Sequence, residues 1–164
     1  QGADKQDELA RLKKEYEERR VQYEAEVARK NAEVDEFEAA YRAKEPDAIV
    51  AYNEMVLSRS EYPDEGFPQK FRVTYNQDSK ELVIEYDLPE ASVVPTVAEY
   101  RYVKSKDAIE SKPQKPAEIR QLYQDVVASI VLRTLHEITE ADQADAIAIL
   151  TFTGIVDAIN PADG

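Results

Sequence analysis

The N-terminal quarter of the chain is a long charged segment whose composition strongly favours a helix. From Asp4 to Lys44 it contains no proline, and the only early glycine, Gly2, precedes it. Glutamate is followed four residues later by a base at three places, an arrangement that supports a helix: Glu15–Arg19, Glu26–Lys30 and Glu38–Arg42. We therefore predict a charged helical stalk over residues 1–45.

Apolar residues recur along the stalk at steps of three, four and seven, the spacing of a coiled coil. This apolar seam consists of Tyr16, Tyr23, Val27, Val34, Phe37 and Tyr41. Leu9 and Leu12 extend it backwards, whereas Arg20 and Lys30 interrupt it. An apolar stripe on a helix is stabilising only when it is buried against another surface. We therefore predict that the stalk forms a homo-oligomer or packs on the rest of the chain. A solvated single helix is the alternative.

The charge balance argues against a phosphate-binding surface as the main feature. The chain has 21 basic and 34 acidic residues, and the part after Glu45 has 11 and 21. Affinity for nucleic acid depends on cations that displace condensed counterions, and this part of the chain is strongly acidic.

The absence of cysteine excludes thiolate metal sites and a cysteine nucleophile. With neither a signal peptide nor an apolar run of membrane-spanning length, we expect a cytoplasmic protein.

The remaining sequence predicts an α+β fold. A second helix is expected over residues 46–60, with a linker to 69 and an accessory domain over 70–164. Three alternating segments indicate strands near residues 71–75, 82–86 and 96–104, arranged as an antiparallel meander. A long central helix over 117–140 and an apolar strand over 147–156 complete the order β-β-β-α-β. The turn-forming residues 160–164 suggest a fragment that stops before a last strand.

Two Asp/Glu-x-Lys triplets invite comparison with metal-dependent nucleases, in which an acid on one strand and such a triplet on the next hold a divalent ion. Asp78-Ser79-Lys80 falls in a predicted turn, and Glu110-Ser111-Lys112 falls in a predicted proline-rich loop. In so charged a chain such triplets are expected by chance. We therefore assign neither a catalytic residue nor a metal ligand.

The single histidine and the aromatic strand residues each have two interpretations. His136 is a candidate general base, with Glu137 as the carboxylate that would orient it. The sequence places no nucleophile near it, so a surface position is favoured. Five strand aromatics are candidates for stacking on bases: Phe71, Tyr75, Tyr86, Tyr100 and Tyr102. The acidity of this region favours packing in the core for these rings.

Several blocks resemble the region that precedes the catalytic domain in Mrr-like bacterial restriction endonucleases. They are Glu81-Leu-Val-Ile-Glu-Tyr-Asp-Leu-Pro89, Val94-Pro95, Glu99-Tyr-Arg-Tyr-Val-Lys104, Leu122-Tyr123, Leu132-Arg-Thr-Leu-His-Glu137 and Ala141-Asp142. The resemblance covers roughly residues 70 to 156. It implies an accessory role in a protein whose separate nuclease domain cleaves DNA with Mg²⁺, and it implies no cofactor in this part of the chain.

Three functions remain open from the sequence. The first is a non-catalytic assembly or targeting module of such a DNA-defence protein. The second is a nucleic-acid-binding module, for which the alternating strand residues Tyr100, Arg101, Tyr102 and Lys104 are the expected contact surface. The third is a metal-dependent enzyme that uses Asp87, Glu99 and either Glu110 or Lys112.

Overall fold

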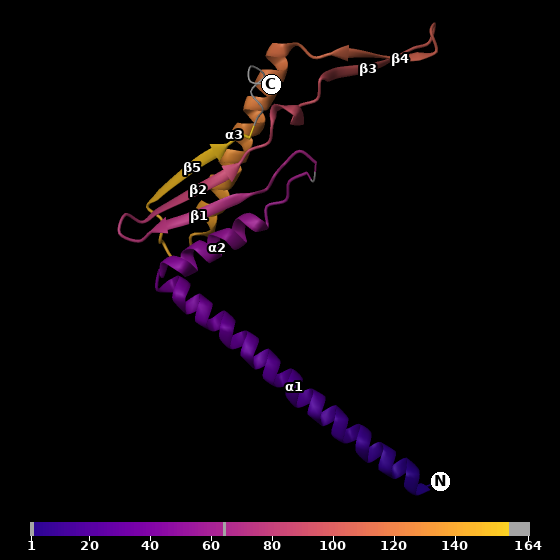
Figure 1. Cartoon of the computed structure of the whole chain (residues 1–164), viewed down its shortest axis with the longest axis vertical. Coiled ribbons are helices and arrows are strands. Elements are labelled where there is room, and N and C mark those ends of the chain that lie inside the picture. Colours follow the sequence, from indigo (N-terminus) through magenta and orange to yellow (C-terminus); the bar gives the residue numbers. More distant parts are fainter. Residues whose placement is uncertain (1, 64, 158–164) are drawn as a thin grey trace. The chain divides into compact units, whose positions relative to one another are not determined.

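The computed structural model describes residues 2–63 and 65–157 and divides into two compact units, residues 1–43 and 44–164 (Figure 1). The first unit is a single helix, α1 (Gly2–Arg42). The second unit holds α2 (Pro46–Ser58), the strands β1 (Phe71–Asn76) and β2 (Glu81–Asp87), the short 3-10 helix η1 (Ala91–Val93), the strands β3 (Val97–Val103) and β4 (Ala108–Pro113), α3 (Pro116–Ala141) and β5 (Ile149–Ile155). The predicted α+β class is confirmed.

Ion pairs between successive turns run along α1. Glu26 and Glu38 pair with Lys30 and Arg42 as predicted, each with a nitrogen–oxygen distance of 2.8 Å. The third predicted pair is wrong, because Glu15 lies 3.4 Å from Arg11 instead. Each exposed pair adds only a few tenths of a kcal/mol, so the helix depends on their number.

Three strands form the main sheet, in the order β1-β2-β5. β1 and β2 make the predicted antiparallel hairpin, with Val73 opposite Ile84 across the turn at 77–80. β5 then pairs in parallel with the other edge of β2. A parallel neighbour requires a crossover connection, and the chain between β2 and β5 includes α3.

The predicted meander is wrong at its third strand. β3 does not join β2; it pairs with β4 in a separate two-stranded sheet. The prolines at 89 and 95 flank η1 between β2 and β3, and proline cannot donate to a continuing ladder. β4 itself was missed because its residues, Ala108–Pro113, are all exposed and do not alternate between apolar and polar.

The core lies on one face of the main sheet. The side chains of β2 alternate between buried and half-buried, with Leu82 and Ile84 fully buried. α2 packs on β1 and α3, and α3 in turn contacts β5 and η1. On α3, Ile130, Thr134 and Ile138 are buried, whereas Leu132 is 67% exposed.

A turn after α3 is held by side-chain hydrogen bonds. Both carboxylate oxygens of Asp142 accept 3.0 Å hydrogen bonds, from the backbone N–H groups of Ala146 and Ile147. The Tyr75 hydroxyl donates to the Ala146 carbonyl at 2.7 Å. These bonds fix the chain as it enters β5. The predicted turn at 160–164 lies outside the described residues.

We predict that Ile84→Ala lowers the free energy of unfolding by about 2–5 kcal/mol, since it removes a fully buried side chain from the central strand and leaves a cavity. Val83→Ala, at the next position on the opposite, half-buried face, is the matched control. Urea denaturation of both variants measures the difference. Equal losses would contradict a core on one face only.

Candidate functional site

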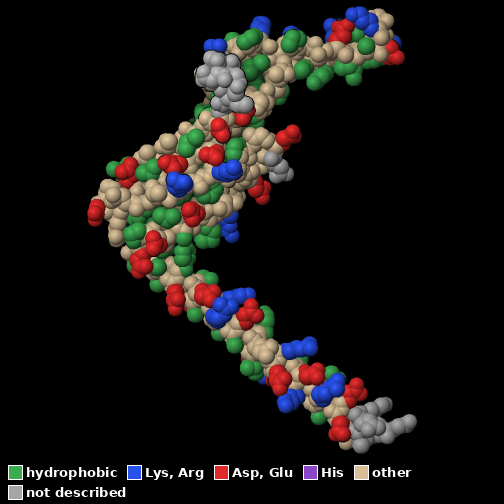
Figure 2. Space-filling model, viewed as in Figure 1, with side chains coloured by type: hydrophobic (Ala, Val, Ile, Leu, Met, Phe, Trp, Pro, Cys, Tyr) green, Lys and Arg blue, Asp and Glu red, His purple; other side chains and the backbone are tan. Residues whose placement is uncertain are grey.

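Most of the apolar seam on α1 is open to solvent. Tyr16, Tyr23 and Val34 are 65%, 68% and 63% exposed, whereas Phe37 is half-buried and Tyr41 is buried. Seam positions separated by seven residues, such as Val27 and Val34, lie on one side of a helix. On the face of α1 that Figure 2 shows, charged side chains of both signs are interspersed.

The two cations that interrupt the seam are neutralised within the same helix. Arg20 lies 2.8 Å from Glu17 and 3.6 Å from Glu24. Lys30 lies 2.8 Å from Glu26. A cation at a coiled-coil core position costs stability but sets register and partner number. Neutralisation by a neighbouring carboxylate lowers that cost, so the seam is compatible with a paired helix.

The predicted contact residues on β3 are divided between two faces of the ribbon that β3 and β4 form, here called the arm (residues 97–113). Tyr100 and Tyr102 share one face, whereas Arg101 is on the other, because successive side chains of a strand alternate. Lys104 lies in the turn between the strands. The structure therefore separates the aromatic residues from the basic residue between them.

The two faces of the arm differ in chemistry. Tyr100, Tyr102 and Ile109 are 71%, 57% and 71% exposed, and Tyr102 is directly opposite Ile109. On the other face, Arg101 is opposite Glu110, whose carboxylate also lies 2.6 Å from the Lys106 amine. Acids thus compensate the bases on that face, and the aromatic face lacks the interleaved cations typical of single-strand binding.

The residues considered for a metal-dependent enzyme do not converge. Glu99 and Glu110 are on the arm, with Lys112 opposite Glu99, while Asp87 ends β2 in the other sheet. The triplet at 110–112 lies on exposed β4 and not in the predicted loop. In the part of the chain that the structure describes, no three His, Asp or Glu side chains gather as a metal site would require.

His136 has a surface environment. Its Nε2 atom lies 3.4 Å from Glu140, and both side chains are exposed. Glu137 instead accepts a 2.8 Å hydrogen bond from Arg133 and a hydrogen bond from the Ser60 hydroxyl. His136 therefore has a carboxylate neighbour on its own helix and no adjacent nucleophile among these contacts.

An apolar groove in the second unit, between residues 62–67, residues 93–95 and α3, was not predicted. It has a volume of about 490 Å³, and its apolar lining includes Tyr62, Phe67, Val94, Leu122, Val126 and Ile130. The α3 residues of this lining belong to the long helix that was predicted over 117–140. The signal that marked the groove was the width of the apolar arc on α3, which exceeds what one sheet face can cover.

Both walls of the groove are held in place. Tyr62 and Phe67 stack with ring centroids 5.9 Å apart, and the Arg133 guanidinium lies 4.8 Å from the centre of the Tyr62 ring. Arg133 also donates a 2.8 Å hydrogen bond to the Glu61 carbonyl. On the other side, the Tyr123 hydroxyl donates at 2.9 Å to the Pro89 carbonyl, just before η1. The groove is thus preformed.

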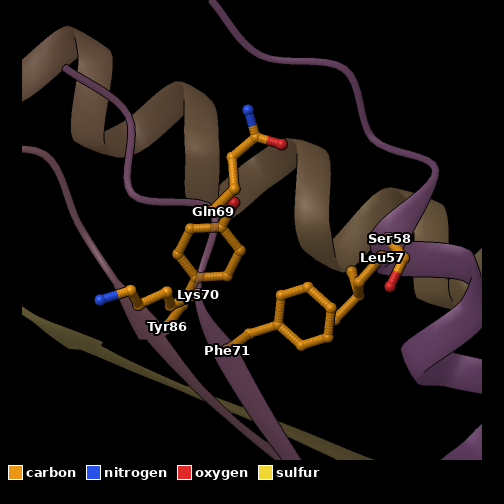
Figure 3. Close-up of a pocket in the computed structure, with 6 residues that line it drawn as sticks. All are labelled: Leu57, Ser58, Gln69, Lys70, Phe71 and Tyr86. Carbon is orange, nitrogen blue, oxygen red and sulfur yellow. The ribbon is translucent and has the colours of Figure 1, made fainter. Parts of the chain in front are cut away.

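A second, smaller hollow of about 380 Å³ lies between the end of α2 and the start of β1 (Figure 3). The Phe71 ring points toward Leu57 and Ser58, while the amino end of Lys70 points away from them. Tyr86 also lines the hollow and stacks on Phe71, with centroids 6.1 Å apart. This hollow offers no paired acid and base, and we assign it no chemistry.

The aromatic residues of the main sheet belong to its packing. Tyr86 is 5% exposed and also stacks on Phe152 at 6.0 Å. Core packing is therefore the correct interpretation for Phe71 and Tyr86. It is wrong for Tyr100 and Tyr102, which are exposed on the arm.

We predict that alkaline pH destabilises the fold through Tyr86. Burial, with Tyr62 and Glu137 nearby, raises the pKa of its hydroxyl above the usual value near 10. The unfolded chain therefore ionises Tyr86 first, and stability present below pH 10 is lost as the pH rises above it, by at most about 1.4 kcal/mol per pH unit for one group.

Urea denaturation of the wild type and Tyr86→Phe between pH 8 and pH 11 measures this effect. The wild type should lose stability relative to the variant above pH 10. A constant difference between the two across this range would mean that Tyr86 ionises as readily in the folded chain as in the unfolded one.

None of the helices in the described residues is long and apolar enough to cross a bilayer. We compared the chain with protein-family models, with curated proteins and with solved structures, and none of the three comparisons gave a match.

Proposed function

We propose that this chain is a non-catalytic assembly module of a DNA-restriction protein, and that α1 pairs with α1 of a second copy. The observation that carries this proposal is the exposed apolar seam, in which Tyr16, Tyr23 and Val34 are each more than 60% exposed. Burying such a stripe against a second helix is favourable at about 25 cal/mol per Å² of apolar area.

The electrostatics of α1 support pairing. Bases of α1 form ion pairs with acids of the same helix, as Arg29 does with Glu33 at 2.7 Å. A second helix therefore approaches a surface on which these charges are already neutralised. Three positions of the seam are tyrosines, whose hydroxyls stay at the edge of a paired interface while the rings are buried. We expect a moderate association and not a tight leucine zipper.

The restriction role rests on the resemblance to Mrr-like endonucleases over residues 70 to 156. In this proposal, Mg²⁺-dependent DNA cleavage belongs to a separate nuclease domain, and the protein acts in the cytoplasm, where foreign DNA arrives. The part described here contributes assembly and positioning. Direct DNA binding through the arm is less favoured, because Arg101 is opposite Glu110 and on the face away from Tyr100 and Tyr102.

We predict that Val34→Lys weakens self-association at least about tenfold, because the variant adds a third cation to the seam one turn from Lys30. The acid one turn further on, Glu38, is already paired with Arg42. Val21→Lys is the matched control, because Val21 is a similarly exposed valine on the same helix, 58% against 63%, but lies off the seam. Light scattering across a concentration series measures the mass of each. A wild-type chain that stays at one copy, or equal effects of the two variants, would contradict pairing through the seam.

The restriction role has its own test in the protein that contains this chain. We expect Mg²⁺-dependent cleavage of DNA by that protein, lowered by Val34→Lys and unchanged by Val21→Lys. The chain of 164 residues alone should not cut DNA with Mg²⁺. Cleavage by the chain alone would overturn the non-catalytic assignment, and cleavage unaffected by Val34→Lys would overturn the assembly role.

A further inference from the structure

The arm has no packing partner in the second unit. Its two strands contact each other and no other helix or strand among the described residues. A two-stranded hairpin alone is at best marginally stable in water. The arm also exposes three large apolar side chains, Tyr100, Tyr102 and Ile109. These properties indicate a surface that is completed by another molecule.

The arm and the apolar groove are suited to each other. The exposed side chains on the arm form one continuous face, since Tyr102 is directly opposite Ile109. The groove is lined mainly by apolar side chains, among them Leu122 and Val126 of α3, and its volume is about 490 Å³. An aromatic or branched apolar side chain is the kind of anchor that a preformed groove of this type accepts.

The distribution of charge favours docking between two copies of this chain, with the arm from one copy and the groove from the other. The arm has four basic residues and three acidic ones, whereas the rest of residues 44–164 has 8 basic and 19 acidic. The turn of the arm holds Lys104, Lys106 and Asp107, of which Lys106 is already paired with Glu110 at 2.6 Å, so Lys104 is the base most open to a second copy. A weakly basic arm therefore meets an acidic body, which favours encounter and orientation between copies.

The base of the arm opposes docking into the groove of the same chain. The Gln114 backbone N–H donates to the Thr96 carbonyl at 2.8 Å, and the Gln114 side chain donates to the Pro95 carbonyl at 2.9 Å. Pro95 also lines the groove. The arm is thus braced where it leaves its own groove, with its apolar face exposed.

We propose that the arm of one copy docks in the apolar groove of a second copy, with Tyr102 and Ile109 against Leu122 and Val126. The exchange is reciprocal about a twofold axis, so that both arms and both grooves are used and the assembly closes. This contact goes beyond the pairing of α1, because it uses different surfaces and holds the second units together directly.

Single-cysteine cross-linking tests the contact, because the natural chain contains no cysteine. A chain carrying Ile109→Cys is mixed with one carrying Leu122→Cys and is oxidised, and peptide mass spectrometry identifies the linked pair. The matched control replaces Ile109→Cys with Glu110→Cys, the next residue, on the charged face of the arm. We expect the first pair to cross-link about tenfold faster, because docking raises the local concentration of the two thiols.

A double variant, Ile109→Cys with Leu122→Cys in one chain, separates docking between copies from docking within a chain. The expected product on a non-reducing gel has twice the chain mass of 18.6 kDa or more. A cross-linked single chain would overturn the exchange. Equal rates for Ile109→Cys and Glu110→Cys, or no cross-link at all, would overturn it as well.

The same mixture made in chains that also carry Val34→Lys distinguishes this contact from the pairing of α1. Retention of the arm–groove cross-link when the seam is broken supports an independent contact. Loss of the cross-link together with the seam would overturn the arm proposal and leave the pairing of α1 standing. If the wild-type α1 helices do not pair but the arm–groove cross-link still forms, only the proposal of pairing through the seam is overturned.

Discussion

The burial of one face of β2 is the constraint on which the rest of the second unit depends. Leu82 and Ile84 are fully buried, and Tyr86 and Leu88 continue the same face. β2 pairs on one side with β1 and on the other with β5, so that this strand joins the whole sheet. Since the period of side chains in a strand is two, a shift of one residue would expose this entire face.

The apolar groove and the arm lie beside this core, and the elements packed on the core hold them in position. α3 presents its buried side to the core through Ile130 and Ile138, while Leu122, nearer its start, is 41% exposed and opens into the groove. Arg133 and Tyr123 fix the two walls through main-chain carbonyls. The arm leaves this framework just beyond Pro95, at the end of the same groove.

Local periodicity made much of this architecture predictable. The long helix follows from its lack of proline and its paired charges, and the β1–β2 hairpin follows from strict alternation on both sides of a polar turn. The partner of β3 could not be predicted in the same way. Its sequence, Val97–Val103, alternates like a sheet strand, but pairing is decided by where the prolines at 89 and 95 direct the chain.

The candidate surfaces were predictable in part for a related reason. The seam is a property of one helix, so spacing alone located it. The division of the arm into two faces depends on the register of Tyr102 with Ile109 and of Arg101 with Glu110. The groove depends on residues far apart in the chain, such as Phe67 and Leu122. A local sequence pattern cannot predict that residues so far apart in the chain line the same groove.

The central claim is that this chain acts by apolar assembly and not by chemistry or by charge. Sedimentation equilibrium of the unmodified chain at low and high salt tests it most directly. Contacts made by apolar side chains persist when salt screens exposed charges, so we predict association to two copies or more under both conditions. A single species of 18.6 kDa at every concentration, or association that disappears at high salt, would contradict the account.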